Sequence, residues 1–356
     1  MKAILSPDDP PSAAVAPSAW HAFGSPPHAD ARVATTSPDA GAETTEFAWS
    51  PDGTRIAYNR GHDLYAVELD SFSAIRLADD SRPVGELTWS PDGTQIAFRL
   101  GRELFVTYAD DPSAKSLAEN ADSQFSWSPD GDRIAFTSGE EGIFVARSDG
   151  SEGNERIRLT EGTGRDRWLM WSPDGTQIAF LSQSGWGYTR DLRRDIYIGR
   201  VDTPGAIRVT GSPSSYARSD LAWSPDGTQL LSTRSVISYD PRITEDPVIH
   251  VLNVDSQRER SLAEGTAPVW SPDGQRIAFA GPLQAGGTYT IATDGTGRVQ
   301  LTHGPDDASP QWSPDGSQIA FVRESDIWVV NADGSGERNV TNSPDVTDSD
   351  PAWAPR

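Results

Sequence analysis

A five-residue motif, Trp-Ser-Pro-Asp-Gly, recurs along this chain and limits the folds that it can adopt. Complete copies begin at Trp49, Trp89, Trp127, Trp171, Trp223, Trp270 and Trp312, and a truncated copy begins at Trp353. Successive tryptophans lie 40, 38, 44, 52, 47, 42 and 41 residues apart. A repeat of roughly 40–50 residues with short strands is typical of a β-propeller, in which each repeat forms one four-stranded blade. The sequence therefore predicts an all-β fold, with residues 1–356 in a single domain.

The residues of each repeat predict where its strands begin and end. In the last complete repeat, strands are predicted at 310–313, 318–322, 326–330 and 337–341. The intervening Pro314-Asp315-Gly316 predicts a turn. Proline presets φ, aspartate accepts hydrogen bonds from the backbone amides that follow, and glycine tolerates positive φ. We therefore interpret the repeated aspartates as turn residues and not as a ring of ligands, and the repeated tryptophans as core.

The number of blades depends on how the N-terminal residues are interpreted. Trp20-His-Ala-Phe23 resembles Trp328-Val-Val-Asn331, and residues 35–39 resemble residues 341–345. We therefore predict eight blades, with the first six residues paired to an inner strand at 351–355, so that the two ends of the chain close the ring. The alternative is seven blades, with residues 1–30 as a leader outside the ring.

The repeat resembles that of the TolB-type propellers, in which Trp-Ser-Pro-Asp-Gly is followed by a second strand ending in Ile-Ala-Phe. The resemblance covers residues 31–356 clearly and 1–30 weakly, and it includes the outer-strand ending Arg158-Leu-Thr160. It implies protein partners and a periplasmic or extracellular location, whereas a start at Met1 without an apolar signal-peptide core implies the cytoplasm. Related propellers also cap prolyl-oligopeptidase-type peptidases or form pectate-degrading lyases, so the fold alone leaves the function open.

Charge and composition argue against several classes of function. The net charge of −22 and the pI near 4.5 argue against binding to nucleic acid, because the chain offers no basic surface to neutralise phosphates. No run of 18 apolar residues is present, which argues against insertion into a membrane. The chain has no cysteine and hence no disulfide, thiolate metal site or catalytic thiol. We expect a monomer without a cofactor.

The sequence contains no recognisable catalytic motif. It has no Gly-x-Ser-x-Gly elbow, and its five histidines are scattered without the spacing of metal ligands. The sequence therefore favours a non-catalytic scaffold that binds a protein or peptide. The alternative is an enzyme, a polysaccharide lyase or a hydrolase, with its site at the mouth of the central channel.

Two insertions break the repeat and predict a partner-binding site. They lie between the second and third strands of the fourth and fifth repeats, at 182–191 and 234–247, and open on the same face as the loops that enter the inner strands. Aromatic and arginine side chains, which dominate interface hot spots, gather in this sector. The predicted site residues are Arg165, Arg167, Trp168, Trp186, Tyr188, Arg190, Tyr216, Arg218, Tyr239 and Arg242. Arginines on an acidic protein suit an acidic partner. The alternative is that the two loops pack on each other and bury Trp186.

Acidic residues recur three positions before several motif tryptophans. They are Glu46, Glu86, Asp220 and Asp350. Gathered at one mouth of the channel, their oxygens could hold a hard cation, which makes them weak candidates for a metal site. We favour their interpretation as solvated acids and predict no metal.

Overall fold

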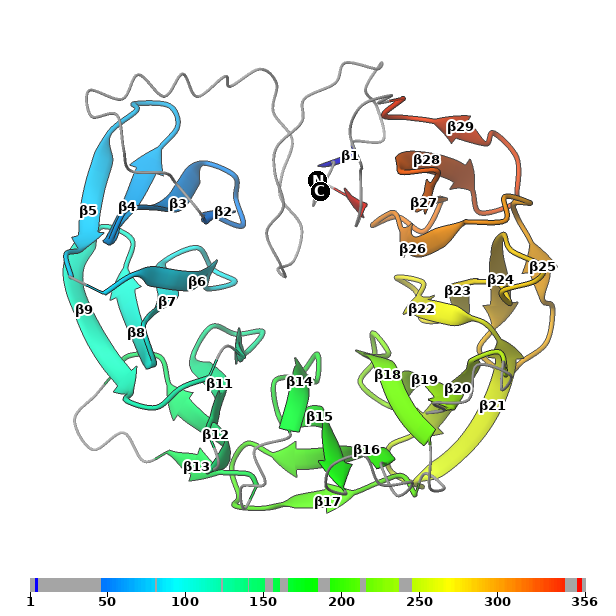
Figure 1. Ribbon diagram of the computed structural model, residues 1–356, viewed down its shortest axis with the longest axis horizontal. Coiled ribbons are helices and arrows are strands. Elements are labelled where there is room, and N and C mark those ends of the chain that lie inside the picture. Colours follow the sequence, from blue (N-terminus) through cyan, green and yellow to red (C-terminus); the bar gives the residue numbers. More distant parts are fainter. Residues whose placement is uncertain are drawn as a thin grey trace.

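The structure is a computed structural model that describes residues 4–5, 46–80, 82–122, 124–139, 141–150, 156–160, 166–184, 193–211, 216–236, 245–342 and 351–353. Its strands form seven four-stranded sheets and one two-stranded sheet. The four-stranded sheets follow one another around a ring, with the first strand of each toward the centre (Figure 1). These residues contain no helix, and hence none that could span a membrane. The predicted all-β propeller is confirmed.

Each four-stranded sheet is an antiparallel meander in chain order, and we number the sheets from the N-terminus. Sheet 1 comprises β2 (Phe47–Trp49), β3 (Arg55–Arg60), β4 (Asp63–Glu68) and β5 (Ala74–Ala78). Sheet 2 comprises β6 (Val84–Trp89), β7 (Gln95–Leu100), β8 (Glu103–Tyr108) and β9 (Asp111–Ala118). Sheet 3 comprises β10 (Phe125–Trp127), β11 (Arg133–Ser138), β12 (Gly142–Arg147) and β13 (Ile157–Arg158).

The remaining sheets repeat this order. Sheet 4 comprises β14 (Asp166–Trp171), β15 (Gln177–Ser184), β16 (Arg193–Arg200) and β17 (Ala206–Arg208). Sheet 5 comprises β18 (Tyr216–Trp223), β19 (Gln229–Val236), β20 (Val248–Asn253) and β21 (Arg258–Glu264). Sheet 6 comprises β22 (Thr266–Trp270), β23 (Arg276–Ala280), β24 (Thr288–Ala292) and β25 (Val299–Gln300). Sheet 7 comprises β26 (Ala308–Trp312), β27 (Gln318–Arg323), β28 (Asp326–Asn331) and β29 (Arg338–Asn339).

Alternating residues of the second strands fill the two interfaces of each sheet. In sheet 2, Ile96 and Phe98 pack with the core of sheet 1, whereas Ala97 packs with the core of sheet 3. The alanines at this position are completely buried: Ala57, Ala97, Ala135, Ala179, Ala278 and Ala320. A small side chain here lets neighbouring sheets approach closely, as the repeat predicts.

Most motif tryptophans are hydrogen-bonded to the preceding sheet; among the described residues, the indole N–H of Trp312 is an exception, because it is buried without a partner. The indole Nε1–H of Trp89 donates to the carbonyl oxygen of Ala48 at 3.0 Å, and that of Trp223 donates to Met170 at 3.0 Å. Trp353 donates in the same way to Gln311, at 3.0 Å, and packs with the core of sheet 7. The predicted core role of the tryptophans is confirmed.

The Ser-Pro-Asp-Gly turns have the hydrogen bonds that their sequence predicts. In sheet 4, Ser172 Oγ–H donates to Asp174 Oδ1 at 2.6 Å, and the same oxygen accepts the Thr176 N–H at 3.0 Å. Gly175 follows with a φ of 68°. The hydrogen bonds from Ser172 and Thr176 hold the pKa of Asp174 below its usual range. The aspartate is thus a turn residue.

The two ends of the chain pair with each other. Strand β1 (Ile4–Leu5) lies beside β30 (Ala352–Trp353), with Leu5 opposite Trp353, as predicted for the first six residues and 351–355. The pair is parallel, however, whereas the first two strands of every four-stranded sheet are antiparallel. Most of the N-terminal 45 residues lie outside the described part of the chain. The described residues therefore show seven complete blades, and the predicted eighth blade stays a prediction.

Candidate functional site

A β-bulge precedes the motif tryptophan in five inner strands. The register of β6, β14, β18, β22 and β26 shifts at this point. The residue three positions before the tryptophan then has positive φ: Glu86 (40°), Trp168 (57°), Asp220 (53°), Ala267 (49°) and Ser309 (50°). Positive φ is uncommon for residues other than glycine, and bulges redirect side chains near functional sites. The backbone conformation at this repeat position is thus the same in five sheets, whereas the side chain differs from sheet to sheet.

Trp168 is the aromatic member of this set and is held in place by a neighbouring sheet. Its side chain is 40% exposed, whereas the motif tryptophans Trp89 and Trp223 are buried. Its backbone N–H donates to Gln124 Oε1, at 3.0 Å, from the residue preceding β10 of sheet 3. The guanidinium of Arg194, on β16, lies over its ring with 5.3 Å between the guanidinium carbon and the ring centroid. Trp168 is therefore an exposed aromatic surface with a fixed backbone.

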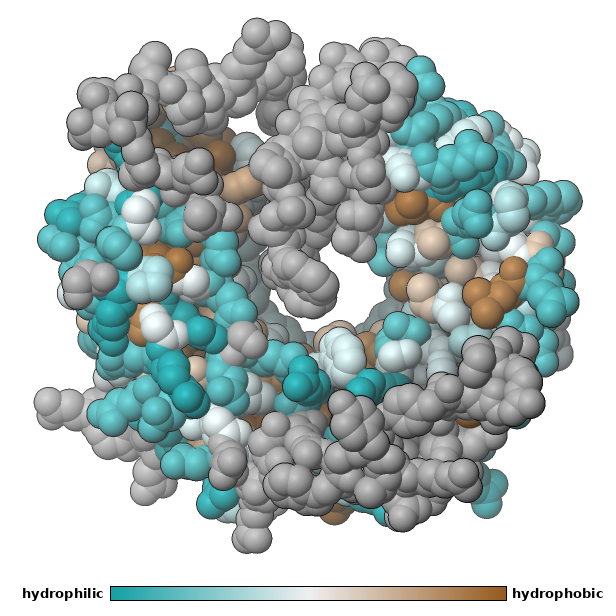
Figure 2. Space-filling view, viewed as in Figure 1, coloured by the Kyte–Doolittle hydropathy of each residue, from teal (hydrophilic) through white to brown (hydrophobic). Residues whose placement is uncertain are grey.

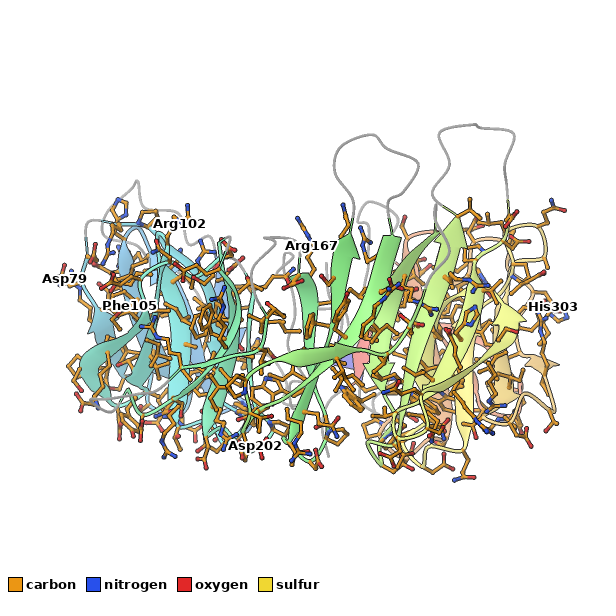
Figure 3. The ribbon with its side chains drawn as sticks, turned by 90° about the horizontal axis from the view of Figure 1, so that it is seen from below. Asp79, Arg102, Phe105, Arg167, Asp202 and His303 are labelled. Atoms are coloured by element: carbon orange, nitrogen blue, oxygen red, sulfur yellow. The ribbon has the colours of Figure 1, made fainter. Side chains whose placement is uncertain are left out.

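Two arginines lie close together beside Trp168. Burial and the positive charge of Arg167 lower the pKa of the Arg194 guanidinium. Arg167 is exposed. In the side view of Figure 3 it lies on the upper face of the ring, whereas Asp202 lies on the lower face. Arg167 and Arg194 thus bring two positive charges to one part of a chain whose net charge is −22. We call Arg167, Trp168 and Arg194 the arginine–tryptophan cluster.

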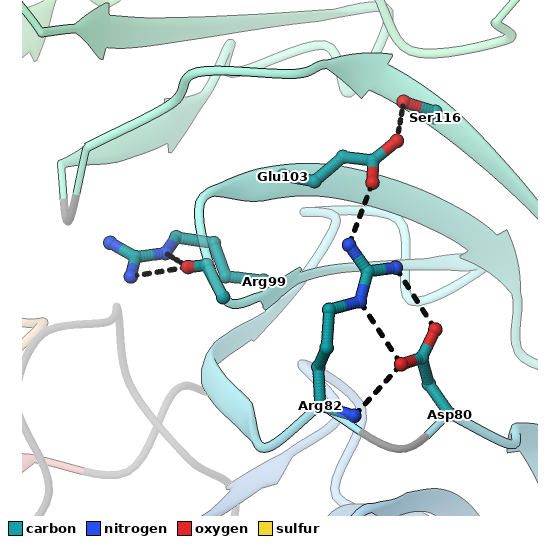
Figure 4. A network of polar contacts seen from close by, with 6 residues as sticks. Asp80, Arg82, Arg99, Glu103 and Ser116 are labelled. Carbon is teal, nitrogen blue, oxygen red and sulfur yellow. Dashed lines mark hydrogen bonds and ion pairs between the residues drawn. The ribbon is translucent and has the colours of Figure 1, made fainter.

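Sheet 2 shows how arginines are matched by carboxylates elsewhere (Figure 4). Arg82 Nη2 lies 2.9 Å from Asp80 Oδ2, and its Nη1 lies 2.9 Å from Glu103 Oε2. These two hydrogen-bonded carboxylates raise the pKa of Arg82, in contrast to the lowered pKa of Arg194. The surroundings of Arg194 thus shift its pKa in the opposite direction to the carboxylates that contact Arg82.

The predicted partner-site residues are only partly brought together. Arg167 and Trp168 lie within β14 itself and not in the loop that enters this inner strand, where they were predicted. Arg165, Trp186, Tyr188, Arg190, Tyr239 and Arg242 lie outside the described residues, as does the side chain of Tyr216. Arg194 was missed by the sequence analysis. Its position at the start of β16, directly after the insertion, was the available signal.

Arg218 is not on the loop surface, and its prediction as an exposed site residue is corrected. Its side chain is 1% exposed and is the largest fully buried side chain among the described residues. Its Nη2 donates to Glu259 Oε2 at 2.9 Å, and its Nη1 donates to Ser232 Oγ at 3.0 Å. His250 Nδ1 lies 3.1 Å from Glu259 Oε1. We call Arg218, Ser232, His250 and Glu259 the sheet 5 polar cluster.

The sheet 5 polar cluster occupies the space of an aromatic pair. Sheets 1, 2, 3, 4 and 6 each stack a ring of the second strand on a ring of the third, with centroids 5.5–5.8 Å apart. In sheet 5, Ser232 faces His250 at these positions. The smaller side chains leave room for Arg218 from the inner strand and Glu259 from the outer strand. Glu259 also lines a cavity of about 450 Å³. Arg218 is buried because two other strands lack their aromatic residues.

The acidic cation candidates do not form a described metal site. Burial raises the pKa of Glu46, opposed by a hydrogen bond from the Glu86 backbone N–H and by the charge of Arg99. Burial also raises the pKa of Glu86, whose carboxylate lies 3.3 Å from Arg99 Nη1. Asp220 is exposed on another sheet, and Asp350 lies outside the described residues. Within the described ranges, no group of three or more His, Cys, Asp or Glu could hold a metal ion.

Comparisons with known proteins identify the fold. Residues 284–350 match the family described as the dipeptidyl peptidase IV (DPP IV) N-terminal region, and no curated protein matches the chain. Dipeptidyl peptidase 4 of Porphyromonas gingivalis is 13% identical, with a TM-score of 0.63 over 85% of this chain and 54% of that one. An oligogalacturonate lyase in complex with manganese is 12% identical, with a TM-score of 0.52 over 77% and 84%. A putative TolB from Agrobacterium tumefaciens is 16% identical, with a TM-score of 0.44 over 82% and 93%.

At these identities the likeness establishes the fold. The chain corresponds to about half the length of the peptidase, since it covers 54% of that chain. Two of these solved structures, the peptidase and the lyase, are enzymes that share this architecture. The predicted β-propeller fold is confirmed, and the resemblance of the repeat to that of the TolB-type propellers stays a prediction.

Proposed function

We propose that this chain is a non-catalytic β-propeller scaffold that binds a carboxylate-bearing protein or peptide through the arginine–tryptophan cluster. The observation that carries the proposal is an exposed Trp168 on a fixed backbone, flanked by Arg167 and Arg194, on a strongly acidic chain. On the face seen in Figure 2, the described residues below and to the left of the central opening are mainly hydrophilic, whereas those to its right include hydrophobic ones.

The chemistry of the cluster favours an acidic partner. A guanidinium can pair with a carboxylate through two hydrogen bonds, and an indole ring adds apolar contact area with little conformational freedom to lose. A bound carboxylate would also relieve the repulsion between Arg167 and Arg194. Because the rest of the chain carries an excess of negative charge, an acidic partner is repelled elsewhere and attracted here.

Binding of a matched pair of peptides tests the proposal. The pair is hexaglutamate and hexaglutamine, each acetylated at its N-terminus and amidated at its C-terminus. Titration calorimetry should show that hexaglutamate binds and hexaglutamine does not. Added salt should weaken the binding of hexaglutamate. Arg167→Ala or Trp168→Ala should weaken it by about tenfold, which corresponds to roughly 1.4 kcal/mol. Arg200→Ala is the control, because Arg200 is an exposed arginine of the same sheet that pairs with Asp202 at the opposite edge.

Three results would contradict the proposal. They are equal affinity for the two peptides, no effect of Arg167→Ala and Trp168→Ala, or an equal effect of Arg200→Ala. The non-catalytic part is tested separately with oligogalacturonate and peptide substrates, with and without divalent metal ions. Turnover of either substrate, abolished by a change at the channel mouth, would replace the scaffold with an enzyme.

A further inference from the structure

Gln124 belongs to the neighbouring sheet and contacts the backbone of Trp168. From this geometry we infer that Gln124 is a positioning residue for the partner site, so that the site spans the seam between sheets 3 and 4. This inference rests on the proposed function, because it concerns how Trp168 is presented to a partner. It adds a residue of a different blade to the site.

The bulge creates a need for an acceptor at Trp168. The pairing of β14 with β15 is interrupted between Arg167 and Met170, and Trp168 has a φ of 57° within this interruption. A bulge residue is left outside the regular ladder of hydrogen bonds. The side-chain oxygen of Gln124, 3.0 Å away, accepts the Trp168 N–H instead. Gln124 is itself anchored, because its backbone carbonyl oxygen accepts a hydrogen bond from the Thr137 N–H at 3.0 Å.

The same two repeat positions also interact between sheets 1 and 2. Glu46 and Gln124 both lie three residues before a motif tryptophan, as do Glu86 and Trp168. The Glu86 backbone N–H lowers the pKa of the Glu46 carboxyl, which burial raises. At the seam between sheets 3 and 4, this interaction is a hydrogen bond from the Trp168 N–H to the Gln124 side chain.

Trp168 departs from this pattern in what its side chain can do. An indole has a hydrogen-bond donor and no acceptor, so it cannot hold the next sheet as a glutamate or glutamine does. Its ring is instead 40% exposed, with Arg194 over one side. The orientation of Trp168 is therefore set twice, at the backbone by Gln124 and at the ring by Arg194. A side chain ordered before binding loses less conformational freedom when the partner arrives.

Two variants at position 124 test the inference. Gln124→Met keeps the length of the side chain and removes the acceptor, whereas Gln124→Glu keeps an acceptor oxygen. Amide hydrogen exchange at Trp168 should become about tenfold faster or more in Gln124→Met and stay near the wild-type rate in Gln124→Glu. Affinity for the capped hexaglutamate should fall about threefold to tenfold in Gln124→Met. In the Trp168→Ala background the same substitution should have no further effect on affinity.

The outcomes separate this inference from the proposed function. Unchanged exchange at Trp168 in Gln124→Met overturns the positioning role. Faster exchange with unchanged affinity also overturns it, while a loss of affinity in Trp168→Ala keeps the proposed function in place. If Trp168→Ala leaves the affinity unchanged, the proposed function and the inference fall together. An equal loss of affinity from Gln124→Met with and without Trp168 would indicate a general structural effect and reject the inference.

Discussion

Replacing Glu259 with glutamine removes the carboxylate that Arg218 contacts in the sheet 5 polar cluster, with little change in side-chain size. Burial would raise the pKa of Glu259, but the neighbouring His250 and Arg218 side chains lower it to about 2. A carboxyl pKa lowered from 4.5 to about 2 corresponds to roughly 3 kcal/mol of stability at neutral pH. Because the side chain is 24% exposed, we expect a loss of about 2–3 kcal/mol in Glu259→Gln.

This loss is measurable as a shift in melting temperature. At ~2.1 cal/mol/K of unfolding entropy per residue, a chain of 356 residues loses about 1.3 °C for each kcal/mol. Calorimetric melts of Glu259→Gln at pH 7 should therefore give a Tm roughly 3–4 °C below that of the wild type. Glu264→Gln, at an exposed position of the same strand, is the control and should shift Tm by less than about 1 °C.

The difference in Tm between Glu259→Gln and the wild type should become smaller as the pH falls. The folded-state pKa of Glu259 lies below the unfolded value, so the stabilisation is present above about pH 4.5 and is lost as the pH falls towards 2. The two Tm values should therefore converge between these pH values, whereas the Glu264→Gln difference stays flat. A Tm difference that is absent, or equally large at pH 7 and pH 3, would refute the view that the ion pair stabilises sheet 5.

Three further substitutions test the repeat itself in thermal melts. Asp174→Ala should cost about 1 kcal/mol through lost turn hydrogen bonds and leave peptide binding unchanged; a loss of binding would contradict its structural role. Trp353→Ala should cost about 3–5 kcal/mol, because it removes a core side chain and the hydrogen bond to Gln311; an unchanged Tm would show that the C-terminal strand is dispensable. Gly142→Ala should destabilise by more than about 1 kcal/mol, since the φ of Gly142 is 111° and an added Cβ would clash with the hydroxyl of Thr160.

The repeat made the fold readable from the sequence. The spacing of the tryptophans and the Pro-Asp-Gly turns located the sheets, because each of these features acts within its own repeat or on the adjoining one. The bulge at Trp168 was not readable, since it depends on how β14 pairs with β15. The contact of Gln124 with Trp168 was missed for the same reason, because it joins equivalent positions of two sheets.

Arg218 shows where reasoning from a single strand fails. An arginine near a loop is usually exposed, and the prediction treated it so. Its burial is decided on two other strands, where Ser232 and His250 replace an aromatic pair. The fifth repeat has Leu-Leu-Ser where the others have Ile-Ala-Phe or Ile-Ala-Tyr, which was a visible signal of extra space. Reading each repeat position across all sheets, and not each repeat by itself, would have found it.

Hydrogen bonds from motif tryptophans to the preceding sheet determine where the ring can be divided; they are made by Trp89, Trp127, Trp171, Trp223, Trp270 and Trp353. Consider a segment that begins at one motif tryptophan and stops before the next. Its own tryptophan packs on the preceding sheet, and the tryptophan that packs on the segment's sheet is missing. Trp89, for example, packs in the core of sheet 1 and donates to Ala48. A fragment that ends after β5 therefore leaves the core of sheet 1 without Trp89. A fragment that extends to Gly93 keeps this tryptophan on sheet 1. Duplication or transplantation of a blade preserves packing only when its borders follow the same rule.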